Sequence, residues 1–260
     1  LHSFPTRRSS DLKLLEDLYE SFKANGATLN KDDKEKYRKL SMDLSMLTLQ
    51  FDQNALKDKN RFELLITDEN ELSGLPESAR DAAAMLAKSK DKNGWLFNLS
   101  APSYIPFMRY SDKRDLREKM YREYMSVGNK GDEFDNKDII KKIVNIRLEI
   151  AQLMGFKNYA EYALEHTMAK NSANVYKLLN QLLEAYKPIA INEYNAVEGF
   201  ALGTEKENIT VMPWDWSYYS EKLRGYPLQG KRRDDSPLFR VKQRKERRIR
   251  ISYPALRYHL

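Results

Sequence analysis

The feature that most limits which fold this chain can adopt is the helical spacing of its apolar residues. This spacing is clearest between residues 100 and 164. One pattern runs from Asp112 to Met125 and a longer one from Lys137 to Met154. In both, apolar side chains recur every three or four positions and therefore share one face of a helix. The patterns predict a pair of packed helices. Their apolar residues are Leu116, Met120 and Tyr124 in the first, and Ile140, Val144, Ile146, Leu148, Ile150 and Leu153 in the second.

The ends of these helices carry residues that favour caps and turns. Ser111 is a candidate N-cap for the first helix. Asp135 or Asn136 can cap the second, because their side chains accept hydrogen bonds from free backbone N–H groups. Gly155 follows the second helix where a left-handed residue closes it. Gly26 is a similar stop signal for an earlier helix.

Helical spacing recurs through most of the remaining chain. It predicts helices over residues 13–25, 31–56, 76–88 and 172–190. We expect the last of them to be interrupted at Pro188, because proline has no backbone N–H to donate.

Two short apolar runs lie among these helices. Residues 62–67 (FELLIT) and 95–99 (WLFNL) are bounded by turn residues, and Asn93 and Gly94 precede the second. Such runs are typical of short strands that pair in an antiparallel ribbon. The sequence therefore predicts a mainly α fold with at most a small β ribbon.

The amino-acid composition excludes several classes of protein. A hydrophobic content of 41% in 260 residues is enough for a sizeable core. No apolar run approaches the roughly 18–20 residues that span a bilayer, so we expect no transmembrane helix and no membrane partner. The chain has no cysteine, which excludes disulfides and thiolate metal ligands and fits a reducing cytoplasm.

The net charge of +7 is very uneven along the chain. Residues 225–260 hold 11 lysines and arginines against three acidic residues, whereas residues 13–224 hold 32 basic and 34 acidic residues. The basic segment has neither a helical face nor interleaved aromatic residues, so we expect no nucleic-acid partner. A nucleic-acid-binding module stays an alternative that rests on this segment alone.

The motifs of common catalytic sites are absent from the sequence. The three histidines are His2, His166 and His259, so no HExxH zinc motif exists. There is also no GxSxG elbow, Walker A loop or GxGxxG loop. We interpret His166 as a polar residue at a helix end. Glu161 and Glu165, one turn apart, are a weak cation site without further ligands.

Two further clusters have simple structural interpretations. The acidic residues between 132 and 135 are typical of a solvated loop. Aromatic residues gather in the segment MPWDWSYYSEKLR, residues 212–224. This density would suit a platform on which bases stack, but it is more typical of buried packing. We therefore expect these aromatic side chains to belong to a core.

Five segments carry a family resemblance: NGATL, LSMDLSMLTLQFDQNAL, PSYIPFMRYSDKRDLREKMY, DNKDIIKKIVNIRLEIAQLMGFKNYAEY and MPWDWSYYSEKLR. They resemble the zinc metallopeptidases of the peptidyl-dipeptidase, thimet oligopeptidase and oligopeptidase A family, and are most similar to the bacterial peptidyl-dipeptidases. The resemblance covers about residues 13–224. It implies that the chain is the N-terminal helical half of a two-lobed zinc oligopeptidase whose halves enclose a deep channel.

The resemblance also implies an activity. We expect a parent enzyme that hydrolyses short, unstructured peptides and releases dipeptides from their C-terminal ends. An endo-acting oligopeptidase of the same family, or a non-catalytic helical scaffold, stays an alternative. We expect the parent enzyme to be a cytoplasmic monomer, with the periplasm as the other compartment because the true N-terminus is missing.

The cofactor that the resemblance implies is zinc. In the family, the two histidines of HExxH and a glutamate on a following helix bind one zinc, and the glutamate inside the motif is the general base. These ligands lie outside this chain. We therefore assign it no catalytic, cofactor-binding or metal-binding residue and expect it to be inactive alone.

The two ends of the chain fall outside the resemblance. Residues 1–12 look like a translated sequencing adapter, and we exclude them from the fold. Residues 225–260 lose every helical pattern. A one-nucleotide shift after Arg224 can turn them into a segment that resembles the family's continuation. Our hypothesis is that this basic tail is the unstructured product of a frameshift.

Overall fold

The computed structural model describes residues 9–205 and 209–225 of the chain, which are mostly helical. The mainly α fold and the small β ribbon that the sequence predicts are confirmed. In chain order the described elements are α1 (Ser9–Ala24), α2 (Lys31–Arg61), β1 (Leu64–Ile66), the 3₁₀-helix η1 (Glu69–Leu72), α3 (Glu77–Ser89), β2 (Trp95–Phe97), α4 (Ala101–Tyr110), α5 (Arg114–Met125), α6 (Lys137–Leu153), α7 (Tyr159–Leu164), α8 (Ser172–Thr204) and α9 (Trp216–Gly225).

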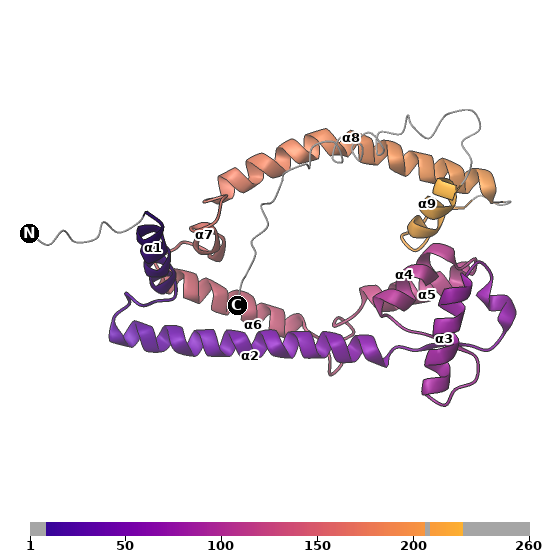
Figure 1. The fold of residues 1–260 in the computed structure, drawn as a ribbon, viewed down its shortest axis with the longest axis horizontal. Helices are drawn as coiled ribbons and strands as arrows, with labels where there is room; N and C mark the ends of the chain where they lie inside the picture. The colour runs from indigo at the N-terminus through magenta and orange to yellow at the C-terminus, as the bar shows by residue number, and fades with distance from the viewer. Residues whose placement is uncertain (1–8, 206–208, 226–260) are drawn as a thin grey trace, which may run out of the picture.

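The described elements form an open ring (Figure 1). Helices α2 and α6 run side by side along one side of it, and α8 arches along the opposite side. Helices α1 and α7 lie at one end of the ring, and α3, α4, α5 and α9 lie at the other. The ring closes at this second end, where α9 contacts both α8 and α4.

The pairing of α2 with α6 follows from their apolar faces. The apolar residues that recur at helical spacing along α2, Tyr37, Leu40, Leu44, Leu47 and Phe51, are half-buried rather than fully in a core. The predicted α6 face is largely wrong. Of its residues, Ile150 is buried, but Ile140, Val144 and Leu148 are 39–56% exposed. The buried face of α6 instead includes Ile139 and Ile143, which the prediction left out. A helix has room for only one partner on each face, so the exposed apolar face of α6 lies open among the described residues.

The main core lies at the closed end of the ring, around the predicted ribbon. Strands β1 and β2 pair antiparallel, with Leu64 opposite Phe97 and Ile66 opposite Trp95. Helices α3, α4 and α5 and Trp214 cover this ribbon and complete the core. Gly94 has a φ of +112°, and a Cβ there would lie 2.3 Å from the Ile66 carbonyl oxygen. Only glycine fits this turn, which the sequence marks as Asn-Gly.

Most predicted helix ends are correct. Gly26 and Gly155 have φ values of +81° and +87°, so both are the left-handed residues expected after a helix. The N-cap position of α6 is Asn136, whose side chain makes no capping bond, and the preceding Asp135 instead accepts a hydrogen bond from the Lys137 N–H at 2.9 Å. Ser111 is a correction: it is buried at the C-terminal end of α4, and α5 begins only at Arg114. The sequence did not predict α4, which holds two prolines.

Pro188 does not interrupt α8, which continues to Thr204. Proline removes one hydrogen bond to the carbonyl four residues earlier, that of Glu184. Both residues are exposed, so water can satisfy that carbonyl and the helix survives. Helix α8 is visibly arched in Figure 1, as a long helix containing proline is expected to be.

The predicted boundaries at the two ends of the chain fall mostly outside the described residues. Helix α1 begins at Ser9, inside the segment 1–12 that we excluded from the fold. The predicted tail 225–260 lies outside the described residues from residue 226 onward.

The end of α2 is held by buried polar groups. Asp58 is fully buried, accepts a hydrogen bond from the Gly128 N–H at 2.7 Å and pairs with Arg61 at 2.7 Å. Asn136 donates to the Phe51 carbonyl at 3.0 Å. The loop between α5 and α6 is therefore fixed against α2 by hydrogen bonds to residues 70 and 85 positions away.

Two glycines in this loop allow a matched test of that fixation. Both Gly128 and Gly131 have positive φ, so alanine at either costs about 1–2 kcal/mol. At Gly128 the new Cβ would also lie 3.0 Å from the Asn136 amide nitrogen, whereas nothing lies within 4 Å at Gly131. We expect Gly128→Ala to lower the free energy of unfolding more than Gly131→Ala, by about 1 kcal/mol, in urea titrations. Equal losses would show that the Asn136 contact does not restrain the loop.

Candidate functional site

The segment from Met212 to Arg224, which carries the family resemblance most densely, is organised by a buried carboxylate. Asp215 is fully buried and accepts hydrogen bonds from the Arg114 Nη2 at 2.7 Å and the Arg117 Nη2 at 2.8 Å. The Met212 N–H donates to the same carboxylate at 3.1 Å. Two charge-assisted pairs and one backbone bond satisfy a charge that burial alone would not tolerate.

Arg117 extends this network into the core. It is 1% exposed and donates to the Ser111 carbonyl at 2.7 Å, and its guanidinium lies 3.9 Å from the Tyr218 ring centroid. The Tyr218 hydroxyl donates to Asp112 at 2.6 Å. Burial raises the pKa of Tyr218, so this hydroxyl stays a donor at neutral pH. Helix α9 is therefore held on α4 and α5 by a chain of polar contacts.

The expectation that the aromatic residues of this segment are packed is confirmed. Trp214, Tyr218 and Tyr219 are 2–6% exposed. Trp216 is half-exposed and stacks on Tyr194 of α8, with ring centroids 5.6 Å apart and an interplanar angle of 10°. These rings contact protein, so they do not form a free platform for bases.

The described residues do not fit a zinc site. No three His, Cys, Asp or Glu side chains come together within residues 9–205 and 209–225 in a way that could hold a metal ion. His166 is exposed at the end of α7, and its Nε2 lies 3.3 Å from Glu165. Glu161 lies in the first turn of α7, where its N–H bonds to the Asn158 cap at 2.9 Å. The chemistry of peptide hydrolysis is therefore not assigned to any described residue.

The acidic residues between 132 and 135 are partly structural. Asp132 pairs with Arg61, and Asp135 accepts hydrogen bonds from the Gly131 and Lys137 N–H groups at 2.6 and 2.9 Å. The prediction of a loop is correct. These carboxylates, however, hold the α2–α6 corner together rather than only facing solvent.

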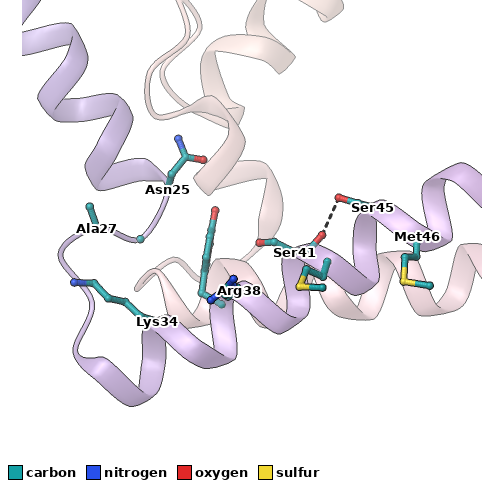
Figure 2. A pocket seen from close by; sticks show the side chains of 10 residues that line it. Asn25, Ala27, Lys34, Arg38, Ser41, Ser45 and Met46 are labelled. Carbon is teal, nitrogen blue, oxygen red and sulfur yellow. Dashed lines mark hydrogen bonds between the residues drawn. The ribbon is translucent and has the colours of Figure 1, made fainter.

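A hollow with a distinctive lining lies where the turn that follows α1, residues 25–27, meets α2 (Figure 2). Its volume is about 690 Å³, within the range of small-molecule and peptide pockets. Figure 2 shows Lys34 and Arg38 projecting from successive turns of α2 below the loop that carries Asn25 and Ala27. Further along α2, Met46 lines this hollow and also a second one of about 600 Å³ between α2 and α6. Sequence reasoning did not identify this hollow, because it depends on how the turn at residues 25–27 lies over α2.

Replacing Asp215 tests the buried network. Asp215→Asn leaves the Arg117 charge buried without a counter-charge, so we expect the free energy of unfolding to fall by about 3–5 kcal/mol in urea titrations. The matched control is Asp138→Asn, whose ion pair with Lys141 is exposed on both sides and should cost less than about 1 kcal/mol. A loss as small as the control's would contradict the central place of Asp215.

The same carboxylate predicts acid sensitivity. Burial raises the pKa of Asp215, but hydrogen bonds from Arg114, the Met212 N–H and Arg117 outweigh burial and hold that pKa below its usual value. A carboxylate with a lowered folded pKa stabilises the fold at any pH above about 4, and the stabilisation is lost as pH falls through the folded value. We expect the urea midpoint of the wild type to fall more steeply below about pH 4 than that of Asp215→Asn. Parallel profiles would contradict this assignment.

Comparisons with known proteins place this arrangement in a family. Residues 107–244 match the model of peptidase family M3, a stretch that includes Arg114, Arg117 and Asp215 and continues past Arg224. The chain is 36% identical to oligopeptidase A of Salmonella typhimurium over 226 residues, which is 84% of this chain and 33% of that protein. It is 38% identical to oligopeptidase A of Haemophilus influenzae over 216 residues, 81% of this chain and 31% of that protein.

A dipeptidyl carboxypeptidase is also among the relatives. The chain is 29% identical to the dipeptidyl carboxypeptidase of Escherichia coli over 217 residues, 83% of this chain and 32% of that protein. It thus spans about a third of the length of the curated relatives it matches. The family match covers more than half of the chain, including the helices joined by the Asp215 network, and the chain belongs to peptidase family M3.

Proposed function

We propose that this chain is the helical part of a zinc-dependent peptidase that hydrolyses short, unstructured peptides, and that it forms one wall of the substrate channel. The match to peptidase family M3 carries the proposal. The arrangement of the long helices in an open ring agrees with a chain that is one part of a larger fold (Figure 1). Zinc would polarise the scissile carbonyl and activate water, and its ligands belong to residues outside this chain.

The exposed apolar faces support a larger parent protein. Nine large apolar residues of α8, from Tyr176 to Tyr194, are 42–65% exposed, and they lie on several sides of the helix. Six of α1, from Leu12 to Phe22, are 46–65% exposed. A helix that is apolar all round is normally buried. We propose that, in a protein of the relatives' length, further residues cover these faces.

The relatives favour one of the two specificities that the sequence leaves open. Identity to the two oligopeptidases A is 36–38%, whereas identity to the E. coli dipeptidyl carboxypeptidase is 29%. We therefore propose internal cleavage of the oligopeptidase A type. Release of C-terminal dipeptides is the second candidate, because the resemblance of the MPWDWSYYSEKLR segment to peptidyl-dipeptidases motivates it.

The setting of the enzyme is also a proposal. We propose a cytoplasmic monomer, which the absence of cysteine supports. Within the part of the chain that the structure describes, each helix is too short or too polar to cross a membrane. We further propose that residues beyond Arg224 are read out of frame. The family match, which continues to residue 244 in the printed frame, counts against this, and resequencing the source DNA across codons 220–260 decides it.

The assay for this function uses two quenched peptides that differ only at the C-terminus. We expect the full-length gene product with zinc to cleave both the free-acid and the amidated peptide. An enzyme that removes C-terminal dipeptides needs a free terminal carboxylate and would cleave only the first. A metal chelator should abolish either activity.

The 260-residue chain alone is the matched control for this assay. We expect it to show no turnover with or without added zinc, because its described residues hold no metal site. Turnover by this chain, or no turnover by the full-length product, would overturn the proposal.

A further inference from the structure

The hollow between the turn at residues 25–27 and α2 has an uncommon balance of charge. Its ten lining residues include two cations, Lys34 and Arg38, and no acid. Both cations are exposed, and neither forms an ion pair with another residue in the described part of the chain. The nearby Asp33 is held by the Asn30 cap, away from the lining. The lining of the hollow therefore carries two positive charges and no negative one.

The turn that lies beside these cations is held in place by contacts with the rest of the chain. The Tyr162 hydroxyl of α7 donates to the Ala24 carbonyl at 2.7 Å, next to the turn that lines the hollow. The Tyr37 ring fills the space beside Gly26, where a Cβ would lie 3.4 Å from it. Gly26 itself has a φ of +81°, a conformation that other residues rarely adopt. The wall around these residues is therefore preorganised.

The floor of the hollow is apolar and adaptable. Met42 and Met46 are 59% and 69% exposed, one turn apart on α2. The hydroxyl of Ser45 donates to the Ser41 carbonyl at 2.9 Å, so it does not need a ligand (Figure 2). Methionine side chains adapt to apolar groups of different shape, which suits a site that accepts varied residues.

We propose that this hollow binds short peptides by their C-terminal residue. The terminal carboxylate pairs with Lys34 and Arg38, and the last apolar side chain lies on Met42 and Met46. A volume of about 690 Å³ holds roughly two or three residues of an extended peptide. The proposal rests on the proposed function for its substrate class, and it adds a holding site away from the chemistry.

The test is a direct binding measurement on the 260-residue chain, independent of hydrolysis. The probe is the peptide Gly-Ala-Leu-Phe labelled with fluorescein at its N-terminus, in free-acid and amidated forms, followed by fluorescence anisotropy. We expect the free acid to bind about tenfold more tightly than the amide. Lys34→Gln combined with Arg38→Gln should weaken the free acid by a similar factor and leave the amide unchanged.

The control variant removes the same amount of charge from the same helix. Lys36 and Lys57 are exposed on α2, line neither hollow and have no ion-pair partner among the described residues. Lys36→Gln with Lys57→Gln should change the affinity less than about twofold. Circular dichroism of all variants should match the wild type, because every changed side chain is exposed.

Three outcomes would overturn the proposal: no saturable binding, equal affinity for acid and amide, or equal weakening in the control variant. Self-association of the chain that Lys34→Gln with Arg38→Gln abolishes would assign the hollow to a second copy instead. If the full-length product hydrolyses peptides but the hollow binds none, the binding site is refuted and the proposed function stands. If the hollow binds peptides but the full-length product hydrolyses none, the proposed function is refuted and the binding site stands.

Discussion

The buried carboxylate of Asp215 is the contact on which one end of the structure depends. It joins Arg114 and Arg117, which lie 101 and 98 positions earlier in the chain. A buried charge costs several kcal/mol unless it is paired. Helix α9 therefore has one well-defined place against α4 and α5, and the far end of α8, which packs on α9 through Val197 and Ala201, is placed with it.

The parts of the fold that repeat along the sequence could be predicted, and the parts that join distant segments could not. Apolar spacing identified α2, α6 and the ribbon, and glycines marked the turns at residues 26, 94 and 155. Asn54 and Asp58 continue the same face of α2 beyond Phe51, but a search for apolar spacing ends where this face becomes polar. Their partners lie in the α5–α6 loop, which no local pattern reveals.

The errors have physical causes too. Ser111 has the right chemistry for an N-cap, but its burial against Arg117 uses it at the end of the preceding helix. Helix α4 was not predicted because it contains proline. Pro102 lies in its first turn, however, where proline is tolerated because an N–H at that position has no partner within the helix. For the candidate hollow, the sequence supplies Lys34 and Arg38 as ordinary surface cations. Only the position of the turn at residues 25–27 over α2 makes them line one hollow.

The position of Pro188 has a mechanical consequence for the ring. Helix α8 connects the two ends of the ring along its upper side in Figure 1. Pro188 lies at the middle of the 33 residues of this helix. The Glu184 carbonyl lacks its helical hydrogen bond, so we expect α8 to bend most easily at this turn. Any change in the separation of the two ends is therefore absorbed by bending at Pro188, while α2 and α6 keep the lower side stiff.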